Sequence, residues 1–180
     1  ARIMGKIFKA LGILERGHTV EVDRESLVAG FIGQTAIKTQ QKIDEALGGV
    51  LFIDEAYALA EGGSGNDFGK EAIEVILKRM EDLRGQFVVF AAGYTDNMNV
   101  FLTSNPGLNS RFDKKLHFED YTPEEMMKIA LHYFSKEELT VTQDAKNHLM
   151  IYFTDIHKNR DKFFGNARTV RQTISEAVKN

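Results

Sequence analysis

Residues 50–55 read Val-Leu-Phe-Ile-Asp-Glu, a run of apolar residues that passes directly into two acids. An apolar run without polar alternation is typical of a strand that is buried on both faces, as in a parallel sheet between layers of helices. Ligands of such sheets bind beyond the carboxyl ends of the strands. The stretch therefore predicts an α/β fold in which Asp54 and Glu55 lie at the ligand-binding edge of the sheet.

Two adjacent carboxylates at the end of a buried strand are costly unless they serve a cation or a proton transfer. In nucleotide hydrolysis, an acid in this place holds Mg²⁺ on the phosphates, and a second acid can polarise the attacking water. The alternative is that Asp54 and Glu55 only cap a helix that follows a core strand. The pair by itself favours neither interpretation.

The rest of the chain supplies the other elements of an α/β sheet and then changes character. Further strands are predicted at residues 19–22, 87–92 and 115–118, and helices at residues 1–15, 36–47, 70–84 and 97–103. After Asp120, the sequence Thr-Pro-Glu-Glu has the pattern of a capping box, and helices are predicted at residues 123–136, 142–157 and 166–180. We therefore predict a doubly wound α/β subdomain at residues 1–120 and a small helical lid subdomain at residues 121–180.

The composition excludes several functional classes. The chain has 180 residues, of which 43% are hydrophobic and 27% charged, as in ordinary soluble domains. A net charge of -3 and a pI of about 6.0 provide no strongly basic field for nucleic acid. The sequence contains no cysteine, no secretory signal and no apolar run of the ~18 residues that a membrane span needs. We therefore expect a cytoplasmic protein without a membrane partner.

Two arginines are candidates for contacts with phosphate. Arg111 lies in Ser-Arg-Phe-Asp, before the last predicted strand. It is either a surface arginine or an arginine finger that reaches the γ-phosphate of a neighbouring subunit. Arg168 ends the sequence Gly-Asn-Ala-Arg and falls in the first turn of a predicted helix. A cation there is poorly placed for the dipole of its own helix, which favours an external anion as its partner, although an exposed helix start also explains it.

Phe31, Ile32 and Gly33 follow another glycine in an otherwise polar loop. Either the apolar residues anchor the loop in the core, or Phe31 is an exposed aromatic side chain that grips a polypeptide. The five histidines show no metal-ligand spacing. The only metal predicted is therefore Mg²⁺ at Asp54.

In this order and spacing, the motifs resemble the AAA+ family of ATPases over essentially the whole chain. Residues 50–55 are similar to its Walker B motif, and residues 31–33 to its aromatic–hydrophobic–glycine pore loop. Residues 110–112 are similar to its arginine finger, and residues 165–168 to its sensor 2. The resemblance implies the AAA+ fold, a doubly wound parallel sheet followed by a helical lid.

A closer likeness is to the CbxX/CfqX group, which includes the red-type Rubisco activases and the stage V sporulation protein K proteins. The stretches that carry it are residues 48–57, 92–94, 105–107 and 165–168. Tyr94 stands at the sensor 1 position, where the family often has asparagine. Thr95 or Asn97 could take over this nucleotide-sensing role.

The sequence departs from the family in one motif, since it contains no Gly-x-x-x-x-Gly-Lys-Ser/Thr, the Walker A loop. In the family, that loop immediately precedes the helix that begins here at Ala1. The first strand of the family's sheet, which leads into that loop, is central in the strand order 5-1-4-3-2, and unpaired backbone in the middle of a sheet is costly. We therefore expect that a longer protein supplies the first strand and the Walker A loop, and that this stretch alone is inactive.

The resemblance implies an ATPase that couples hydrolysis of Mg-ATP to the remodelling of a client protein. Asp54 would hold Mg²⁺ through water, and Glu55 would act as the base. Arg111 would act on a neighbouring subunit, Arg168 would contact the nucleotide of its own subunit, and residues 31–33 would contact the client. The implied assembly is a homo-oligomeric ring, a hexamer.

Two other functions are compatible with the family. One is an ATP-dependent assembly switch or scaffold that orders a ring without threading a substrate. The other is a nucleic-acid motor, which the acidic pI and the aromatic residue of the pore loop disfavour.

Overall fold

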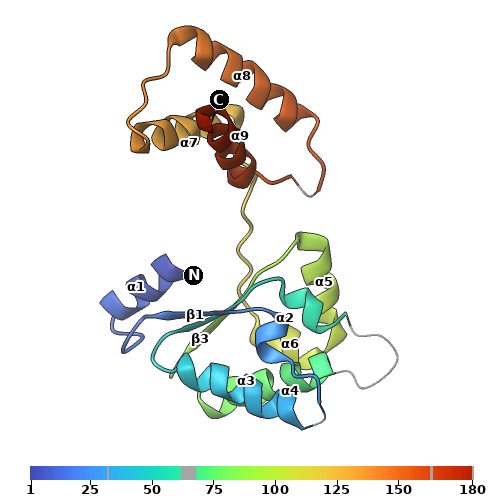
Figure 1. Ribbon diagram of the computed structural model, residues 1–180. Coiled ribbons are helices and arrows are strands. Elements are labelled where there is room, and N and C mark those ends of the chain that lie inside the picture. The colour runs from blue at the N-terminus through green and yellow to red at the C-terminus, as the bar shows by residue number, and fades with distance from the viewer. Residues whose placement is uncertain (32, 62–67, 163, 180) are drawn as a thin grey trace. The chain divides into compact units, whose positions relative to one another are not determined.

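A computed structural model of the chain describes residues 1–31, 33–61, 68–162 and 164–179. The chain divides into two compact units, Ala1–Lys115 and Leu116–Asn180. The first unit contains, in chain order, α1 (Arg2–Ala10), β1 (Thr19–Val22), α2 (Arg24–Leu27), α3 (Gln34–Glu45), β2 (Val50–Ile53), the 3₁₀ helix η1 (Ala56–Leu59), α4 (Phe68–Asp82), β3 (Val88–Ala91), α5 (Thr95–Ser104) and α6 (Pro106–Arg111) (Figure 1). The second contains α7 (Pro123–Lys136), α8 (Gln143–Lys158) and α9 (Ala167–Lys179).

The sheet of the first unit has three parallel strands in the order β1-β2-β3. Leu51 of the central strand is in register with Val20 on one side and Val89 on the other. Val50, Leu51 and Ile53 are fully or almost fully buried, as expected for a strand with neighbours on both edges and helices on both faces. The predicted α/β fold with a parallel sheet is thus confirmed.

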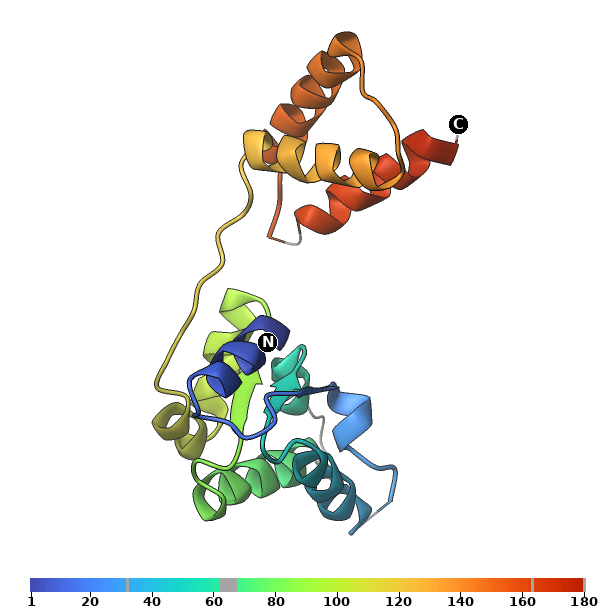
Figure 2. The same cartoon turned by 90° about the vertical axis from the view of Figure 1, so that its left-hand side faces the viewer.

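Alternate residues of the strands face the two helix layers. Leu51 and Ile53 belong to the main core of this unit together with Ile43 of α3 and Ile76 of α4, and both helices lie along one face of the sheet (Figures 1 and 2). On the other face, Phe8 of α1 stacks on Phe90 of β3, with ring centroids 6.4 Å apart; Phe90 is in register with Phe52 of β2. The sheet therefore lies between α1 and the pair α3–α4.

The prediction of a strand at residues 115–118 is wrong. This segment has no strand structure, and Leu116 and Phe118 are 65% and 86% exposed. In the sheet order of the family, this strand pairs with the first strand, and none of the described residues supplies that neighbour. Without a partner its backbone has no ladder to join, so its apolar side chains have no sheet face on which to pack.

Several predicted boundaries also need correction. α1 ends at Ala10 instead of residue 15, and the chain turns at Gly12, whose φ of 71° suits glycine. Residues 105–107, whose Asn-Pro-Gly sequence is a turn signal, form the start of α6: Asn105 accepts a hydrogen bond from the backbone N–H of Gly107 at 2.8 Å, and proline follows at the first helical position. Asn-Pro is a cap signal as well as a turn signal.

In the second unit, α7 packs against both α8 and α9 (Figure 2). The capping box at its start is present: Thr122 accepts from the backbone of Glu125, whose side chain accepts from the backbone of Thr122. Its core is formed by residues from all three helices, Met126, Met127, Ala130, Phe153, Val170 and Ile174. This small core is separate from that of the first unit.

Candidate functional site

Asp54 and Glu55 lie at the carboxyl end of the central strand, where the sequence places them. The backbone N–H of Asp54 donates to the carbonyl of Val22 at 2.8 Å, which continues the pairing of β2 with β1. Both acids are exposed to solvent. The strand thus delivers two carboxylates to the edge of the sheet without burying either of them.

The backbone turns sharply at Glu55. Its φ of 47° and ψ of 46° are left-handed, a conformation that non-glycine residues seldom adopt and that clusters at functional sites. The chain passes from this residue into η1, and the carbonyl of Glu55 accepts from Ala58 at 2.8 Å. Asp54 accepts from the N–H of Glu55 at 3.1 Å through its carboxylate. The two acids are therefore fixed by a defined turn, and Glu55 is the N-cap of η1 without a capping hydrogen bond from its side chain.

The loop after β3 holds this turn from the side. The N–H of Ala56 donates to the carbonyl of Ala92 at 3.0 Å. Gly93 lies against the ring of Tyr57 so closely that a Cβ on it would be 2.6 Å from the ring carbon Cδ1. The ring of Tyr94, at the predicted sensor 1 position, lies 6.5 Å from that of Tyr57, centroid to centroid. Tertiary structure thus brings Tyr94 next to the acidic turn.

Tyr57 is a site residue that sequence reasoning missed. Its pKa is raised above the ordinary tyrosine value, first by burial and then by the negative charge of Glu55, to which its hydroxyl is hydrogen-bonded. The negative charge of Glu55 thus opposes loss of the proton from the Tyr57 hydroxyl. The signal in the sequence was its place in the Asp-Glu-Ala-Tyr run. Of the two alternatives to Tyr94, Asn97 donates to Glu61 at 3.5 Å, and Thr95 begins α5.

The acidic edge fits the coordination habits of Mg²⁺. Mg²⁺ uses one or two protein carboxylates, keeps several waters and takes phosphate oxygens, and it seldom uses a cage made of protein alone. The described residues contain no group of three or more acids, histidines or cysteines that could form such a cage. Asp54, an exposed carboxylate at the end of β2, has the donor chemistry that a phosphate-bound Mg²⁺ requires.

Arg111 ends α6 and is engaged within its own chain. Its Nη2 lies 3.5 Å from an oxygen of Glu81, which also accepts from Arg84 at 2.9 Å. The Arg111 side chain is 31% exposed, and its Nε is buried without a hydrogen-bond partner among the described residues. The Arg111 side chain is therefore partly buried, but its ion pair with Glu81 is long and weak.

Phe31 is 72% exposed, so the interpretation of this residue as a buried loop anchor is wrong. Gly33 has a φ of 79° and precedes α3, whereas Ile32 lies outside the described residues. Two buried threonines of α3 anchor the loop instead. Thr35 accepts from the N–H of Ala29 at 3.0 Å, and Thr39 donates to the carbonyl of Leu27 at 3.0 Å.

Arg168 is the second residue of α9 and is exposed. No hydrogen bond or ion pair with another described residue engages its guanidinium. Asn166, just before the helix, has a left-handed φ of 52°. At Gly165, a Cβ would lie 2.6 Å from the hydroxyl of Thr169, so a larger residue there would force that side chain to rotate. A nucleotide site shared by Arg168 and Asp54 is a prediction.

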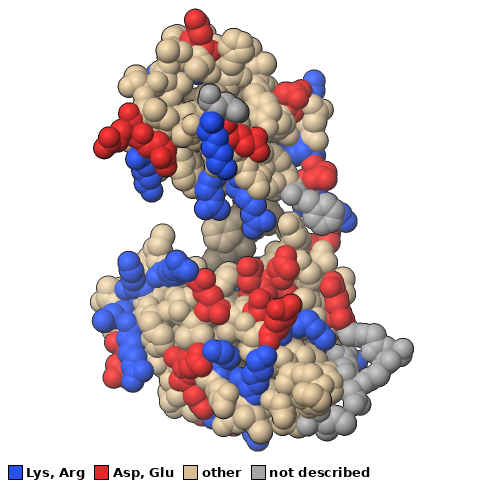
Figure 3. All heavy atoms as spheres, in the orientation of Figure 1, with Lys and Arg blue, Asp and Glu red and all other residues tan. Residues whose placement is uncertain are grey.

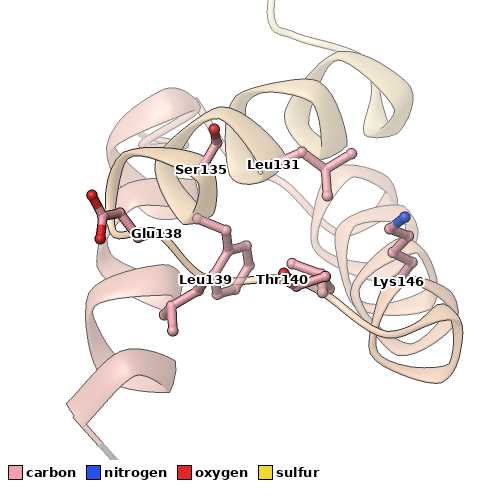
Figure 4. Close-up of a pocket in the computed structure, with 8 residues that line it drawn as sticks. Leu131, Ser135, Glu138, Leu139, Thr140 and Lys146 are labelled. Atoms are coloured by element: carbon pink, nitrogen blue, oxygen red, sulfur yellow. The ribbon is translucent and has the colours of Figure 1, made fainter.

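A shallow pocket of about 360 Å³ lies at the other end of the second unit, between the end of α7 and the start of α8 (Figure 4). Leu131, Phe134, Leu139 and Val141 supply its apolar lining. None of the residues predicted for the nucleotide site lines it.

Comparison with known proteins identifies the class. The model of the AAA family, ATPases associated with various cellular activities, matches residues 3–120, and the AAA lid domain matches residues 122–180. The chain belongs to the AAA family of ATPases and carries its lid domain. No helix in the described ranges combines the length and the apolar character that a membrane span requires.

Individual relatives confirm the resemblance to the CbxX/CfqX group. The chain is 42% identical over 180 residues to stage V sporulation protein K of Bacillus subtilis (strain 168), covering 99% of this chain and 56% of that protein. It is 42% identical over 177 residues to the chloroplastic ribulose bisphosphate carboxylase/oxygenase activase of Cyanidioschyzon merolae, covering 98% and 60%. It is 41% identical over 174 residues to protein CbbX of Cereibacter sphaeroides, covering 97% and 56%. The chain thus spans little more than half the length of these relatives.

Proposed function

We propose that this chain is the catalytic part of a longer ATPase, which couples hydrolysis of Mg-ATP to the remodelling of a client protein in a homo-oligomeric, hexameric ring. The observation that carries the proposal is the acidic turn in an AAA chain: Asp54 and Glu55 are exposed at the end of the central strand, and Glu55 is held in a left-handed conformation. A mere helix cap needs neither feature.

The two acids divide the chemistry between them. Asp54 would hold Mg²⁺ through a water molecule, and the ion would neutralise charge on the phosphates. Glu55 would accept a proton from the attacking water. The water oxygen would then bond to the γ-phosphorus, and the bond between the γ-phosphorus and the β–γ bridging oxygen would break. The hydrogen bond from Tyr57 would direct the carboxylate.

The arginines would stabilise the negative charge on the γ-phosphate. Arg111, whose bond to Glu81 is long at 3.5 Å, would leave it to reach the nucleotide of a neighbouring subunit. Arg168, exposed at the start of α9, would contact the nucleotide of its own subunit from the lid. Tyr94 would sense the phosphate from the end of β3.

The stretch by itself should hydrolyse ATP negligibly. The sequence has no Gly-x-x-x-x-Gly-Lys-Ser/Thr, so no loop amides and lysine cradle the phosphates. The relatives that it matches are longer than the chain. Turnover by this stretch that Glu55→Gln abolishes would contradict this part of the proposal.

A protein client is supported by Phe31, whose exposed ring is suited to grip a polypeptide. On the face of the first unit seen in Figure 3, basic side chains gather over α1 at the left, and acidic side chains lie across the middle, so no basic surface covers the whole face as nucleic acid would favour. An assembly switch without substrate threading is the second candidate. It shares the acidic turn but has no use for an exposed aromatic ring at position 31.

The test uses the longer protein with its Walker A loop. Glu55→Gln should keep ATP bound and abolish turnover, because the base is lost while the phosphate contacts remain; wild-type turnover would reduce the acidic pair to a helix cap. Phe31→Ala should keep ATP turnover but lose the stimulation by an unfolded polypeptide, with casein as the probe. Stimulation that Phe31→Ala leaves unchanged would favour the switch.

A further inference from the structure

One carboxylate in the second unit joins segments that are far apart in the sequence. The Oδ1 atom of Asp120 accepts from the side-chain amide of Asn166 at 2.9 Å. Its Oδ2 atom accepts from Nε of Arg160 at 2.9 Å. The amide oxygen of Asn166 accepts in turn from the backbone N–H of Tyr121 at 3.0 Å. We call Asp120, Tyr121, Arg160 and Asn166 the lid clamp.

The lid clamp gathers the ends of all three helices of this unit. Asp120 and Tyr121 directly precede Thr122, the N-cap of α7. Arg160 follows the end of α8 and also donates to the carbonyl of His157 at 2.6 Å. Asn166 directly precedes α9. The clamp thus fixes the start of α9 to the segment that leads the chain from the first unit into the second.

The ion pair of the clamp adds little stability. The side chains of Asp120 and Arg160 are 39% and 37% exposed, and ion pairs with that exposure contribute little to folding. Asn166 moreover has a left-handed φ of 52°, which asparagine tolerates better than most residues. Its amide uses a donor and an acceptor at once, which defines the orientation of the backbone from which α9 starts.

That orientation determines where Arg168 lies. The N–H of Arg168 donates to the carbonyl of Gly165 at 2.8 Å, so its backbone is one turn from the clamp. A change in the backbone angles of Asn166 would therefore shift the backbone of Arg168 and, with it, the guanidinium. The clamp holds Asn166, the residue before α9, while the buried side chains of Val170 in the first turn and Ile174 in the next pack the helix against the lid core.

We propose that Asp120 and Asn166 are positioning residues for the contact of Arg168 with ATP, and that they pass the position of Arg168 to the segment entering the lid. The inference rests on the proposed role of Arg168. It goes beyond that role because it assigns the coupling to a hydrogen-bonded pair that touches no nucleotide. A γ-phosphate that draws in Arg168 would then pull on residues 120–121 through Asn166.

The pair allows a sharp test, because its donors and acceptors can be exchanged. Asn166→Asp keeps a residue that tolerates positive φ and keeps the acceptor for Tyr121, but it sets a second carboxylate against Asp120. Asp120→Asn combined with Asn166→Asp reverses the bond: the new amide donates to the new carboxylate, and Arg160 keeps an acceptor. The net charge of the clamp is the same as in the wild type.

The experiment measures the ratio of ATP to ADP affinity with fluorescent nucleotides, in the longer protein with Glu55→Gln to prevent hydrolysis. Asn166→Asp should lower the ratio of ATP to ADP affinity by about tenfold. This corresponds to the lower end of the range expected when one charge-assisted hydrogen bond is lost. The exchanged double variant should restore it. Asn159→Asp is the matched control, since the side chain of Asn159 donates to Asp155 of α8 at 3.0 Å.

The outcomes separate this inference from the proposed function. If Arg168→Ala leaves the ratio unchanged, the proposed role of Arg168 fails. If Arg168→Ala lowers the ratio and Asn166→Asp does not, the positioning role is overturned. It is also overturned if the double variant fails to restore the ratio, or if Asn159→Asp lowers it equally, because the loss is then a general effect of an added charge in the lid.

Discussion

Glu81→Gln removes the charge that holds Arg111 within its own chain. Glu81 binds Arg84 closely, at 2.9 Å, whereas its distance to Arg111 is 3.5 Å. With the two side chains 31% and 52% exposed, an ion pair of this kind is worth about 0.2–1 kcal/mol. Since about 1.4 kcal/mol corresponds to tenfold in an equilibrium constant, the pair can hold the arginine back by at most about fivefold.

The variant should therefore raise ATP turnover of the longer protein slightly, within about fivefold of the wild type. Arg111→Ala should lower turnover far more, by about 10³–10⁵-fold, which is the effect of an arginine finger in GTPases. The assay is steady-state phosphate release at saturating ATP, with ring assembly checked by light scattering. Glu74→Gln, at an exposed glutamate on the same helix α4, is the control.

Mixed rings test whether Arg111 acts on the neighbouring subunit. Subunits with Arg111→Ala mixed with subunits carrying Glu55→Gln should regain part of the activity, because one type of interface then pairs an intact acid with an intact arginine. Two results would refute the reasoning: no recovery in mixed rings that have formed, or a loss from Glu81→Gln as large as that from Arg111→Ala.

Three further predictions concern the acidic turn and the lid. Asp54→Asn should weaken the use of Mg-ATP, seen as a higher Mg²⁺ requirement for turnover, and an unchanged requirement would count against its metal role. Tyr57→Phe should lower kcat with little change in KM, because it removes only the hydroxyl that donates to Glu55; equal turnover of the variant and the wild type would leave the ring with a packing role. Thr122→Ala should destabilise the lid by about 1 kcal/mol through loss of the capping box, measured by denaturant unfolding, whereas Thr140→Ala, in the loop after α7, should cost less.

Local patterns in the sequence were sufficient for much of the fold. The strand at residues 50–53 and the helix at residues 123–136 lie where the apolar run and the capping box predict them, and the strand predicted at residues 19–22 is also present. The position of the acidic pair was also predictable, because Asp54 and Glu55 come directly after the strand at residues 50–53 in the sequence and so lie at its carboxyl end. The missed helix α6 had a local signal too, because Asn105 and proline form its cap.

Other features were decided only by tertiary structure. A strand at residues 115–118 needs a neighbour, which its own apolar pattern does not provide. The left-handed turn of Glu55 depends on hydrogen bonds to the loop after β3. Asp120 meets Asn166 across 46 residues of sequence. Periodicity and caps are properties of a few consecutive residues and can be read along the chain, whereas these contacts exist only once separate segments have packed together.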